Sequence, residues 1–560
     1  MAKISEYPTI TSLVGNELVL MDAGLPGNRA TVTATTNTLA EAIASGLGIF
    51  SGTQSGSVPG SGGGIGRTLR SDATWQLAFD PTTGTFGYYA QTTAESGAGV
   101  TPTNFSYPPN NVLRYGADPT ATLDSTAAIM QGVSIAHVQG GGRVYLPAGR
   151  YLVGSSTQIN YSYNNIYLVG DGNAATGLIN ASATQPAISV GNGSPLFHGG
   201  VSGMYITTKS GVTALNGNSG IFYNNLSQFI LRDVVVSNAN AANYRGVFFE
   251  NCGEFFVYNL FVQQSLNDGI TLEGTTDAFM LACNSNSNGG AGYVLNATQG
   301  GEYVGCYAFG NAGSGWGLIS GDPTSAPNLN NAFFDCVADT SGSHNWLIDD
   351  SFDSWWVGCW GSTQQSKSVN TFACGFQTAS QYCRNLRFVG CIALNNNSHG
   401  FQCFDTGSSA PQKIEFVGCQ YGSISPSANG NGQAAGGGYG FASNGGVDHI
   451  RIAGGIFDGN ATGAIHNTGT GTDVVVTGRP VGYINSNSGT ATSVSDGGTI
   501  SHGLNDQTNG ITPKSVSLIG TNPNNIISVS ALSSSTITVA IKTTAGAAGS
   551  TQTVYWSASA

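Results

Sequence analysis

The centre of the chain repeats with a period of 23 residues, and this repeat limits the possible folds more than any other feature. An apolar residue that follows a small or turn-forming residue recurs at this spacing, with a seven-residue insertion near 322–331 and longer insertions further on. The residues of this first column are Val247, Ile270, Tyr293, Trp316, Trp346, Phe401 and Ala464. A fixed period of this length is typical of stacked units that bury one continuous core between them.

A second column supports the same register. Ten positions before members of the first column lie Leu260, Cys283, Cys306, Cys336 and Cys391, and the fragment Val-Gly-Cys begins at Val304, Val357, Val389 and Val417. The chain has 10 Cys but no CxxC pair and no Cys/His cluster with the spacing of a zinc site. We therefore expect buried, reduced thiols stacked about 4.8 Å apart, because the geometry of adjacent coils disfavours disulfides.

The composition decides between helical and strand repeats. The chain contains 82 Gly, and its many Asn and β-branched residues are poor helix formers, so a helical solenoid is excluded. A coil of about 23 residues has room for two or three short strands joined by tight turns. The sequence therefore predicts an all-β chain built around a parallel β-helix.

Three regions of the chain differ in composition and sequence pattern. Residues 1–110 contain a short helical pattern at 37–45 and a Gly/Ser-rich segment at 52–66. Residues 111–480 carry the repeat, preceded by a helix expected from Ser125 to Val138 with Asp124 as its cap. Residues 481–560 are rich in turns, and the alternation from Thr536 to Ile541 predicts a two-faced strand in a small β-sandwich or barrel.

Charge and hydropathy exclude several kinds of partner. The formal net charge is -12 and there is no basic patch, so nucleic acid is not an expected partner. No run of about 18 apolar residues is present, so we expect no membrane insertion. The opening residues lack a charged segment followed by an apolar run, so no secretion signal is expected.

The start of the second region resembles a known family. Asn111-Val112, Gly116-Ala117-Asp118, Asp124-Ser125-Thr126-Ala127-Ala128-Ile129 and Gly141-Gly142-Arg143-Val144-Tyr145-Leu146-Pro147-Ala148-Gly149-Arg150-Tyr151 follow the opening pattern of the pectate-lyase-like β-helix superfamily. The match covers about 40 residues. It implies a right-handed parallel β-helix with an N-terminal capping helix, and it does not specify a reaction.

Both ends of the chain resemble parts of bacteriophage tail proteins. The stretch from Val58 to Trp75 is similar to a segment of phage tail fibres and spikes, and the stretch from His502 to Trp556 is similar to their C-terminal domains. In this order, the resemblances imply a homotrimeric phage tailspike located in the virion. Its N-terminal region would attach to phage baseplate or tail proteins, and its C-terminal region would trimerise.

The tailspike resemblance implies recognition and degradation of a bacterial surface polysaccharide, such as a capsule, an exopolysaccharide or an O-antigen. Glycosidic hydrolysis by two carboxylates is the expected reaction, and no cofactor is expected. A polysaccharide lyase on the same fold is the first alternative. For a lyase, calcium bound by acidic side chains stays an alternative means of neutralising the uronate carboxylate. A non-catalytic receptor-binding spike is the second alternative.

Acidic residues fall at fixed distances from the first column. Glu250, Glu273 and Asp349 each lie three residues after an anchor, and Asp277 and Asp353 lie seven residues after one. We therefore expect two outward columns of carboxylates along one edge of the β-helix. Such carboxylates are candidate acid, base or nucleophile groups for glycoside hydrolysis, and solvated turn residues are the alternative interpretation.

Further candidates come from the alternation of inward and outward side chains on either side of the Cys column. Asp335 is expected to point outward, and Glu302 to lie at a strand start or be buried. Outward aromatic rings could stack on sugar rings. Parity predicts that these rings are Trp356, Trp360, Tyr303 and Tyr307, with Trp355 in the core.

Overall fold

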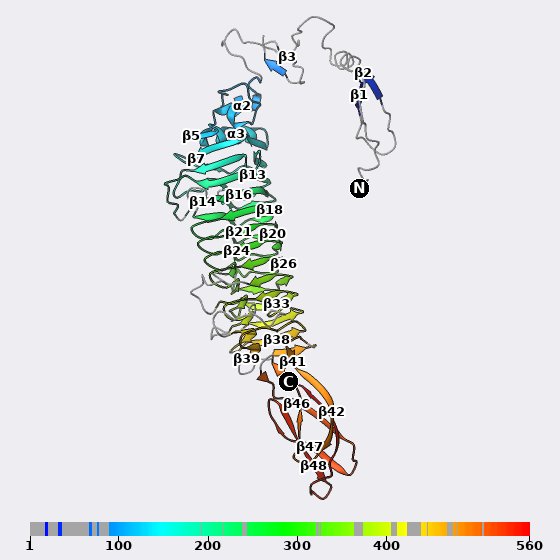
Figure 1. Ribbon diagram of the computed structural model, residues 1–560. Helices are drawn as coiled ribbons and strands as arrows, with labels where there is room; N and C mark the ends of the chain where they lie inside the picture. Colours follow the sequence, from blue (N-terminus) through cyan, green and yellow to red (C-terminus); the bar gives the residue numbers. More distant parts are fainter. Residues whose placement is uncertain are drawn as a thin grey trace. The chain divides into compact units, whose positions relative to one another are not determined.

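The computed structural model describes residues 89–559 and four short strands before them (Figure 1). Residues 192, 216, 238–243, 321–323, 325, 363–372, 405–410, 423–437, 445, 468–473, 479 and 507–508 are not described. The helix expected at 37–45 and the Gly/Ser-rich segment at 52–66 also lie outside the described residues. The chain forms two compact units, residues 1–92 with 102–109 and residues 93–101 with 110–560.

The first unit contains two antiparallel strand pairs among its described residues. The strand β1 (Glu17–Leu20) pairs with β2 (Val32–Thr35), and β3 (Arg67–Leu69) pairs with β4 (Trp75–Leu77). β3 and the first residue of β4 lie within the segment that resembles phage tail proteins.

The main body of the second unit is a right-handed parallel β-helix, as the repeat and the family resemblance predict. Its coils contribute strands to a sheet of 12 strands and a sheet of 24 strands, stacked one above another in Figure 1. The 12-stranded sheet contains β8 (Ile159–Tyr161), β11 (Ile188–Val190), β14 (Ser219–Asn224), β17 (Arg245–Glu250), β19 (Ile270–Glu273), β22 (Tyr293–Asn296), β25 (Trp316–Ile319), β28 (Trp346–Ile348), β32 (Phe376–Thr378), β35 (Phe401–Cys403), β37 (Tyr439–Ser443) and β39 (Gly463–Asn467).

The 24-stranded sheet wraps the remaining sides of the coils. Its strands are β5 (Thr120–Asp124), β6 (Gly142–Leu146), β7 (Gly149–Val153), β9 (Ile166–Gly170), β10 (Thr176–Asn180), β12 (Leu196–Phe197), β13 (Gly199–Thr208), β15 (Leu226–Ser227), β16 (Ile230–Ser237), β18 (Gly253–Gln263), β20 (Thr276–Leu281), β21 (Asn284–Asn286), β23 (Glu302–Val304), β24 (Tyr307–Phe309), β26 (Ala332–Phe334), β27 (Val337–Asp339), β29 (Ser351–Phe352), β30 (Trp355–Val357), β31 (Trp360–Ser362), β33 (Cys383–Val389), β34 (Ile392–Leu394), β36 (Gln412–Val417), β38 (Asp448–Ala453) and β40 (Val474–Thr477).

The first column predicted from the repeat is confirmed from Val247 to Trp346, whose members pair in register from coil to coil. Beyond Trp346 the prediction missed two coils. Phe376 stands between Trp346 and Phe401, and Phe441 follows Phe401. The partner of Phe441 is Ile465, so the assignment of Ala464 was wrong by one residue. Unequal insertions hid these coils because they removed the constant spacing.

Two stacks of aromatic rings fill the core. In the first, the ring of Trp346 stacks on Trp316 at 5.0 Å between centroids and on Phe376 at 5.6 Å. In the second, Phe333 stacks on Trp356 at 5.1 Å. The two stacks meet edge to face, with Phe333 and Trp346 at 5.4 Å and 80°. Edge-to-face and offset stacked pairs are both favourable ring geometries, so the coils interlock through their largest side chains.

The Cys column is confirmed, including the cysteines of the recurring Val-Gly-Cys fragments. All ten cysteines are buried thiols. Six of them follow one another on successive coils, namely Cys283, Cys306, Cys336, Cys359, Cys391 and Cys419. Each thiol also bonds a backbone carbonyl of a neighbouring coil, for example Cys306 to Met280 at 3.5 Å. The column therefore tolerates a weakly polar group inside an apolar core.

A helical cap covers the first coil. It consists of α2 (Thr93–Gly97), the 3-10 helix η2 (Val112–Tyr115) and α3 (Thr126–Val138). The predicted helix is confirmed, but its N-cap is Ser125 and not Asp124. Asp124 Oδ1 still accepts a hydrogen bond from the Thr126 amide at 2.8 Å. The fully buried Arg114 and Glu95 form an ion pair at 2.5 Å that joins η2 to α2. Among the described residues, no helix is long and apolar enough to cross a membrane.

The C-terminal strands enclose a second, smaller core. The sheet β42 (Ser486–Val494), β49 (Gln552–Ser559) and β46 (Ser515–Gly520) faces the sheet β43 (Thr499–Ser501), β48 (Thr536–Thr543) and β47 (Asn525–Leu532). A third small sheet contains β41 (Tyr483–Ile484), β44 (Asn505–Asp506) and β45 (Asn509–Gly510). The alternation predicted in β48 is confirmed, because Ile537, Val539 and Ile541 are buried.

Candidate functional site

The two predicted columns of carboxylates lie at one corner of the β-helix, where each coil leaves the 12-stranded sheet and enters the 24-stranded sheet. We call this the acidic corner and define it as residues 250–254, 273–277, 296–300 and 349–353. Glu250 pairs in register with Glu273, and Glu273 with Asn296. Asp349 follows β28, whose Ile348 pairs with Leu318, so it continues the same column two coils beyond Asn296.

The second column of the acidic corner occupies left-handed backbone positions. The φ angles are 51° at Asp277, 66° at Gly300, 55° at Asn330 and 51° at Asp353. Asp, Asn and Gly are the residues that adopt this conformation most readily. A turn function therefore explains the residue types at Asp277 and Asp353, and any chemical function of their carboxylates is additional to it.

The upper part of the acidic corner contains Glu250, Glu273 and Asp277. The Glu250 carboxylate accepts a hydrogen bond from the Asn224 side chain, and Glu250 is half-buried. The side chains of Glu273 and Asp277 are exposed. Among the described residues, none of these three carboxylates forms an ion pair with a cation. Adjacent strands lie about 4.8 Å apart, so Glu250 and Glu273 are neighbours at the strand ends.

The lower part of the acidic corner contains Asp349 and Asp353 in a different electrostatic setting. Asp349 is exposed at its surface, and desolvation by the atoms around it raises its pKa above the ordinary value. Asp353 is exposed and accepts a hydrogen bond from Asn385 Nδ2 at 2.8 Å. The Asp349 carboxyl therefore keeps its proton to a higher pH than an ordinary aspartate does.

Asp350 is a feature of this turn that sequence reasoning missed. Its side chain is only 2% exposed. Oδ2 accepts a hydrogen bond from the Asn328 amide at 3.0 Å, whereas Oδ1 is buried without a hydrogen-bond partner. Desolvation, reinforced by the nearby charge of Asp349, raises the pKa of Asp350 to about 6. The only signal in the sequence was the pair of consecutive acids, which does not reveal which one turns inward.

A titration tests the state of Asp350. The folded chain is expected to keep a proton on this carboxyl between pH values of about 4 and 6, where the unfolded chain has released it, because the pKa is raised to about 6. The stabilisation from this group is therefore present at low pH and lost as the pH rises through about 6. Infrared difference spectra should show a protonated carboxyl band at pH 5 that vanishes at pH 8.

The band should be missing from Asp350→Asn and retained in Asp353→Asn, which changes an exposed carboxylate of the same turn. An unchanged band in Asp350→Asn would contradict the assignment.

Two of the predicted aromatic residues do not point outward. Trp356 and Tyr303 are both 0% exposed, so these orientation predictions were wrong, and Trp355, expected in the core, is 54% exposed. The physical reason is a left-handed residue between the two inward positions. Gly358, with φ 65°, separates Trp356 from Cys359 and turns the chain there, so strict alternation does not extend across it.

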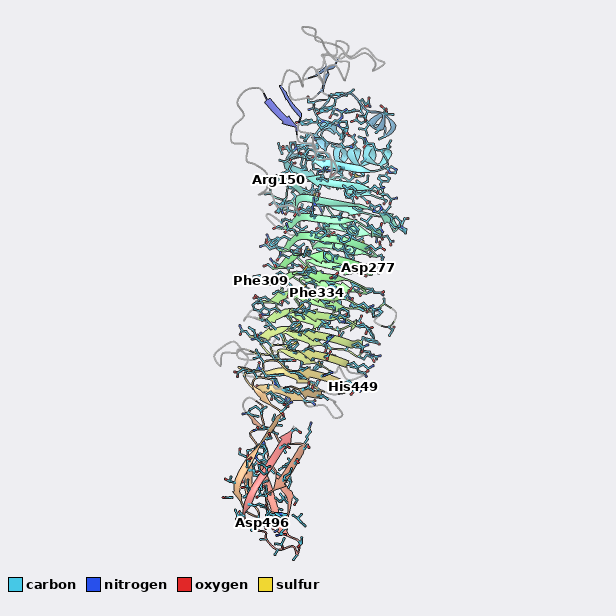
Figure 2. The ribbon with its side chains drawn as sticks, turned by 90° about the vertical axis from the view of Figure 1, so that its right-hand side faces the viewer. Arg150, Asp277, Phe309, Phe334, His449 and Asp496 are labelled. Carbon is cyan, nitrogen blue, oxygen red and sulfur yellow. The ribbon has the colours of Figure 1, made fainter. Side chains whose placement is uncertain are left out.

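The other two aromatic predictions are confirmed in position. Tyr307 is 44% exposed and Trp360 is 38% exposed. Tyr307 pairs with Val337 from the preceding coil, and Trp360 pairs with it from the following coil. The two residues therefore lie two coils apart in one outward column. In Figure 2, Phe309 of the same strand as Tyr307 lies on one side of the stack and Asp277 of the acidic corner lies on the other.

Glu302 and Asp335 are both exposed. Glu302 begins β23 and pairs with Phe279 on one side and Ala332 on the other. Of the two expectations, the strand start is confirmed and burial is wrong, because the left-handed Gly305 interrupts the alternation of side chains as it does for Tyr303. Asp335, with φ 51°, sits at a left-handed corner whose next coil carries Gly358, so a turn function also explains its residue type.

The strands that follow the acidic corner present one outward column, which we call the sheet face. In chain order it contains Ile230, Phe256, Phe279, Glu302, Ala332, Trp355, Arg387, Glu415 and Arg451. Arg387 forms an ion pair with Glu415 at 3.1 Å, and the Arg384 guanidinium lies 6.0 Å from the ring of Phe352. Aromatic rings, carboxylates and guanidinium groups therefore lie side by side along the stack.

Within the part of the chain that the structure describes, no three His, Cys, Asp or Glu side chains are grouped to hold a metal ion.

Comparison with known proteins places this geometry in context. Residues 110–316 match the family described as rhamnogalacturonase A/epimerase, pectate lyase-like. A curated relative, mannuronan C5-epimerase AlgE3 of Azotobacter vinelandii, is 40% identical over 70 residues, which are 12% of this chain and 4% of that protein. The chain thus spans only a small part of the length of that relative.

Two solved structures share the fold. The A-module of mannuronan C-5 epimerase AlgE6 from Azotobacter vinelandii aligns with a TM-score of 0.52 at 17% identity, covering 65% of this chain and 99% of that one. The tailspike protein gp49 from Pseudomonas phage LKA1 aligns with a TM-score of 0.53 at 10% identity, covering 80% of this chain and 99% of that one. At these identities the likeness concerns the fold alone.

Proposed function

We propose that this chain, a pectate-lyase-like right-handed β-helix protein, is a phage tailspike that binds and cleaves a bacterial surface polysaccharide. One observation supports the proposal most strongly. Exposed carboxylates of the acidic corner lie beside exposed aromatic rings on strands of the same coils, as with Asp353 and Trp355. Sugar polymers are bound by such rings and cleaved by such carboxylates.

Hydrolysis by Asp349 and Asp353 is the reaction that we favour. The desolvation that raises the pKa of Asp349 suits a general acid, which must hold a proton to give to the leaving oxygen. Asp353, held by Asn385, would act as the base that activates water or as the nucleophile. Trp355, two residues further along the chain, would stack against a sugar ring beside the cleaved bond.

The upper carboxylates form a second candidate pair. Glu273 and Asp277 occupy the same two columns as Asp349 and Asp353, and the half-buried Glu250 adjoins Glu273 in register. These side chains lie on the same corner, so a polymer lying along the stack could contact both pairs. Glu302 and Asp335 are further carboxylates of this surface, and Tyr307 and Trp360 are further rings that could contact the polymer.

A lyase is the second candidate, and one observation favours it. Arg384 and Arg387 follow Asp353 on the next coil, where Arg384 pairs with Phe352 and Arg387 with Trp355. A guanidinium can neutralise the carboxylate of a uronic acid while a base removes the neighbouring proton. The enzyme whose A-module shares this fold is named for mannuronan.

The remaining parts of the proposal concern assembly. The N-terminal region would attach to baseplate or tail proteins of the virion, and the C-terminal strands would hold a homotrimer. Both assignments rest on the resemblance of these segments to phage tail proteins. The chain would then act at the surface of the bacterial cell.

A direct assay tests the proposed reaction. The full chain is incubated with purified capsule, exopolysaccharide and O-antigen from candidate hosts, and polymer size and product mass are followed. Shortened products that have gained one water per cleavage are expected. Products that absorb in the ultraviolet through a new double bond would establish the lyase in place of the hydrolase. Binding without any shortening would contradict cleavage and leave a receptor-binding spike.

A further inference from the structure

A pocket opens on the outer surface of the first coils, on strands that precede those of the acidic corner. Its volume is about 290 Å³. It lies over β6, β9, β13 and β16, and its lining includes Arg143, Tyr167, Gly200, Ser202, Ile230 and Arg232. This size is at the lower end of the range for small-ligand sites and is sufficient for one sugar residue.

The register of the strands explains why a pocket forms there. Tyr167, Gly200 and Ile230 follow one another in an outward column, with Arg143 next to Tyr167. A Cβ atom at Gly200 would come within 2.0 Å of the Ile230 carbonyl oxygen, so no side chain can stand at this position. The missing side chain leaves a hollow between the phenol of Tyr167 and the apolar side chain of Ile230.

Two guanidinium groups flank this hollow, although the chain is acidic overall. The formal net charge is -12, with only 18 Lys and Arg in 560 residues. Arg143 is exposed and forms no ion pair with any described residue. Arg232 pairs with Asp233 at 3.3 Å, but both side chains are largely exposed, and such surface pairs contribute little. The guanidinium groups are therefore available to an anion.

We propose that this pocket binds an acidic sugar residue through its carboxylate. Arginine forms paired hydrogen bonds with carboxylates, and the ring of Tyr167 with the side chain of Ile230 offers an apolar surface to the sugar ring. The inference rests on the proposed function and narrows it, because it makes the bound polymer a uronic-acid-containing polysaccharide.

The position of the pocket supports a polymer rather than an isolated sugar. Ile230 continues in register to Phe256, Phe279 and Glu302 on the next three coils, which are members of the sheet face. Three steps of about 4.8 Å separate Ile230 from Glu302 by about 14 Å. A polysaccharide lying along the stack would contact the pocket and the Glu302 carboxylate of the sheet face at the same time.

The test measures binding to immobilised surface polysaccharides that contain uronic acid, each offered in native and carboxyl-reduced form. Arg143→Gln/Arg232→Gln is expected to bind the native polymers at least 10-fold more weakly than the unchanged chain. The matched control, Lys209→Gln/Lys514→Gln, removes the same charge at exposed positions outside the pocket and should bind normally. Carboxyl reduction should weaken binding of the unchanged chain and abolish the difference between it and the double arginine variant.

The outcomes separate this inference from the proposed reaction. The inference would be overturned if the double arginine variant bound native polymers as tightly as the unchanged chain does. It would also be overturned if the unchanged chain bound carboxyl-reduced polymers as tightly as native ones. Loss of binding only after chemical removal of phosphate groups would also overturn it, since the anion would then be a phosphate. If binding depends on the two arginines but no polymer is shortened, the inference stands and the proposed cleavage fails.

Discussion

Asp349→Asn and Asp353→Asn are each expected to lower the rate of polysaccharide cleavage by about 10²–10⁴-fold, the usual contribution of a general acid or base. Both changes preserve side-chain shape, and Asn is at home in the left-handed conformation of position 353. The folded chain should therefore be retained, and binding of the polymer should change little. Cleavage is measured by the appearance of new reducing ends, with Asp448→Asn as a control for losing a surface carboxylate of the same β-helix.

The upper pair provides the contrast. Glu273→Gln and Asp277→Asn remove the corresponding carboxylates of the same two columns. Full activity in both lower variants, with loss in an upper one, would move the reaction to Glu273 and Asp277. Full activity in all four variants would remove the acidic corner from the reaction. The desolvation that raises the pKa of Asp349 also predicts that the alkaline limb of the pH profile lies above the ordinary pKa of an aspartate.

Trp346→Ala is expected to produce the largest loss of stability, about 3–5 kcal/mol. The indole is fully buried and lies in the first aromatic stack, where it also meets Phe333 edge to face. Its Nε1 donates a hydrogen bond to the Trp360 carbonyl at 3.1 Å. Alanine would leave a cavity between coils that interlock through these rings. The midpoint of denaturant unfolding and the rate of unfolding both report the loss.

Trp360→Ala is the matched control, because it removes the same side chain from a position that is 38% exposed on β31, a strand of the other sheet. Its effect on stability should be much smaller, whereas its effect on polymer binding should be the larger of the two. Equal destabilisation by the two substitutions would show that the aromatic stack does not hold the coils together.

The fold followed from the sequence where the coils are uniform. From Val247 to Trp316 the constant spacing fixed the register of each coil, and the observed pairing agrees. Phe376 and Phe441 were missed because insertions of unequal length precede them. Spacing in the sequence predicts the register of the coils only where the loops have constant length. The burial of Phe376 and Phe441 does not depend on loop length, so both residues continue the column although the spacing does not reveal them.

The candidate site was predicted in part. The columns of Glu273 and Asp349 depend on position after a strand, which the repeat supplies. The orientation of Trp356 depends on the left-handed Gly358, which breaks the period of two, so parity alone gave the opposite answer. The inward turn of Asp350 depends on a hydrogen bond from Asn328 on another coil, and no local pattern in the sequence contains that contact.

The stacking of equivalent coils has a consequence for how such a protein can change. Each coil contacts mainly the coils on either side, so gaining or losing one whole coil leaves every local turn intact. Gaining or losing coils between the arginine pocket and the acidic corner therefore changes the distance between them in steps of about 4.8 Å. A β-helix of this design could therefore match a new polymer repeat length by gaining or losing coils, while the groups proposed to bind and cleave the polymer stay unchanged.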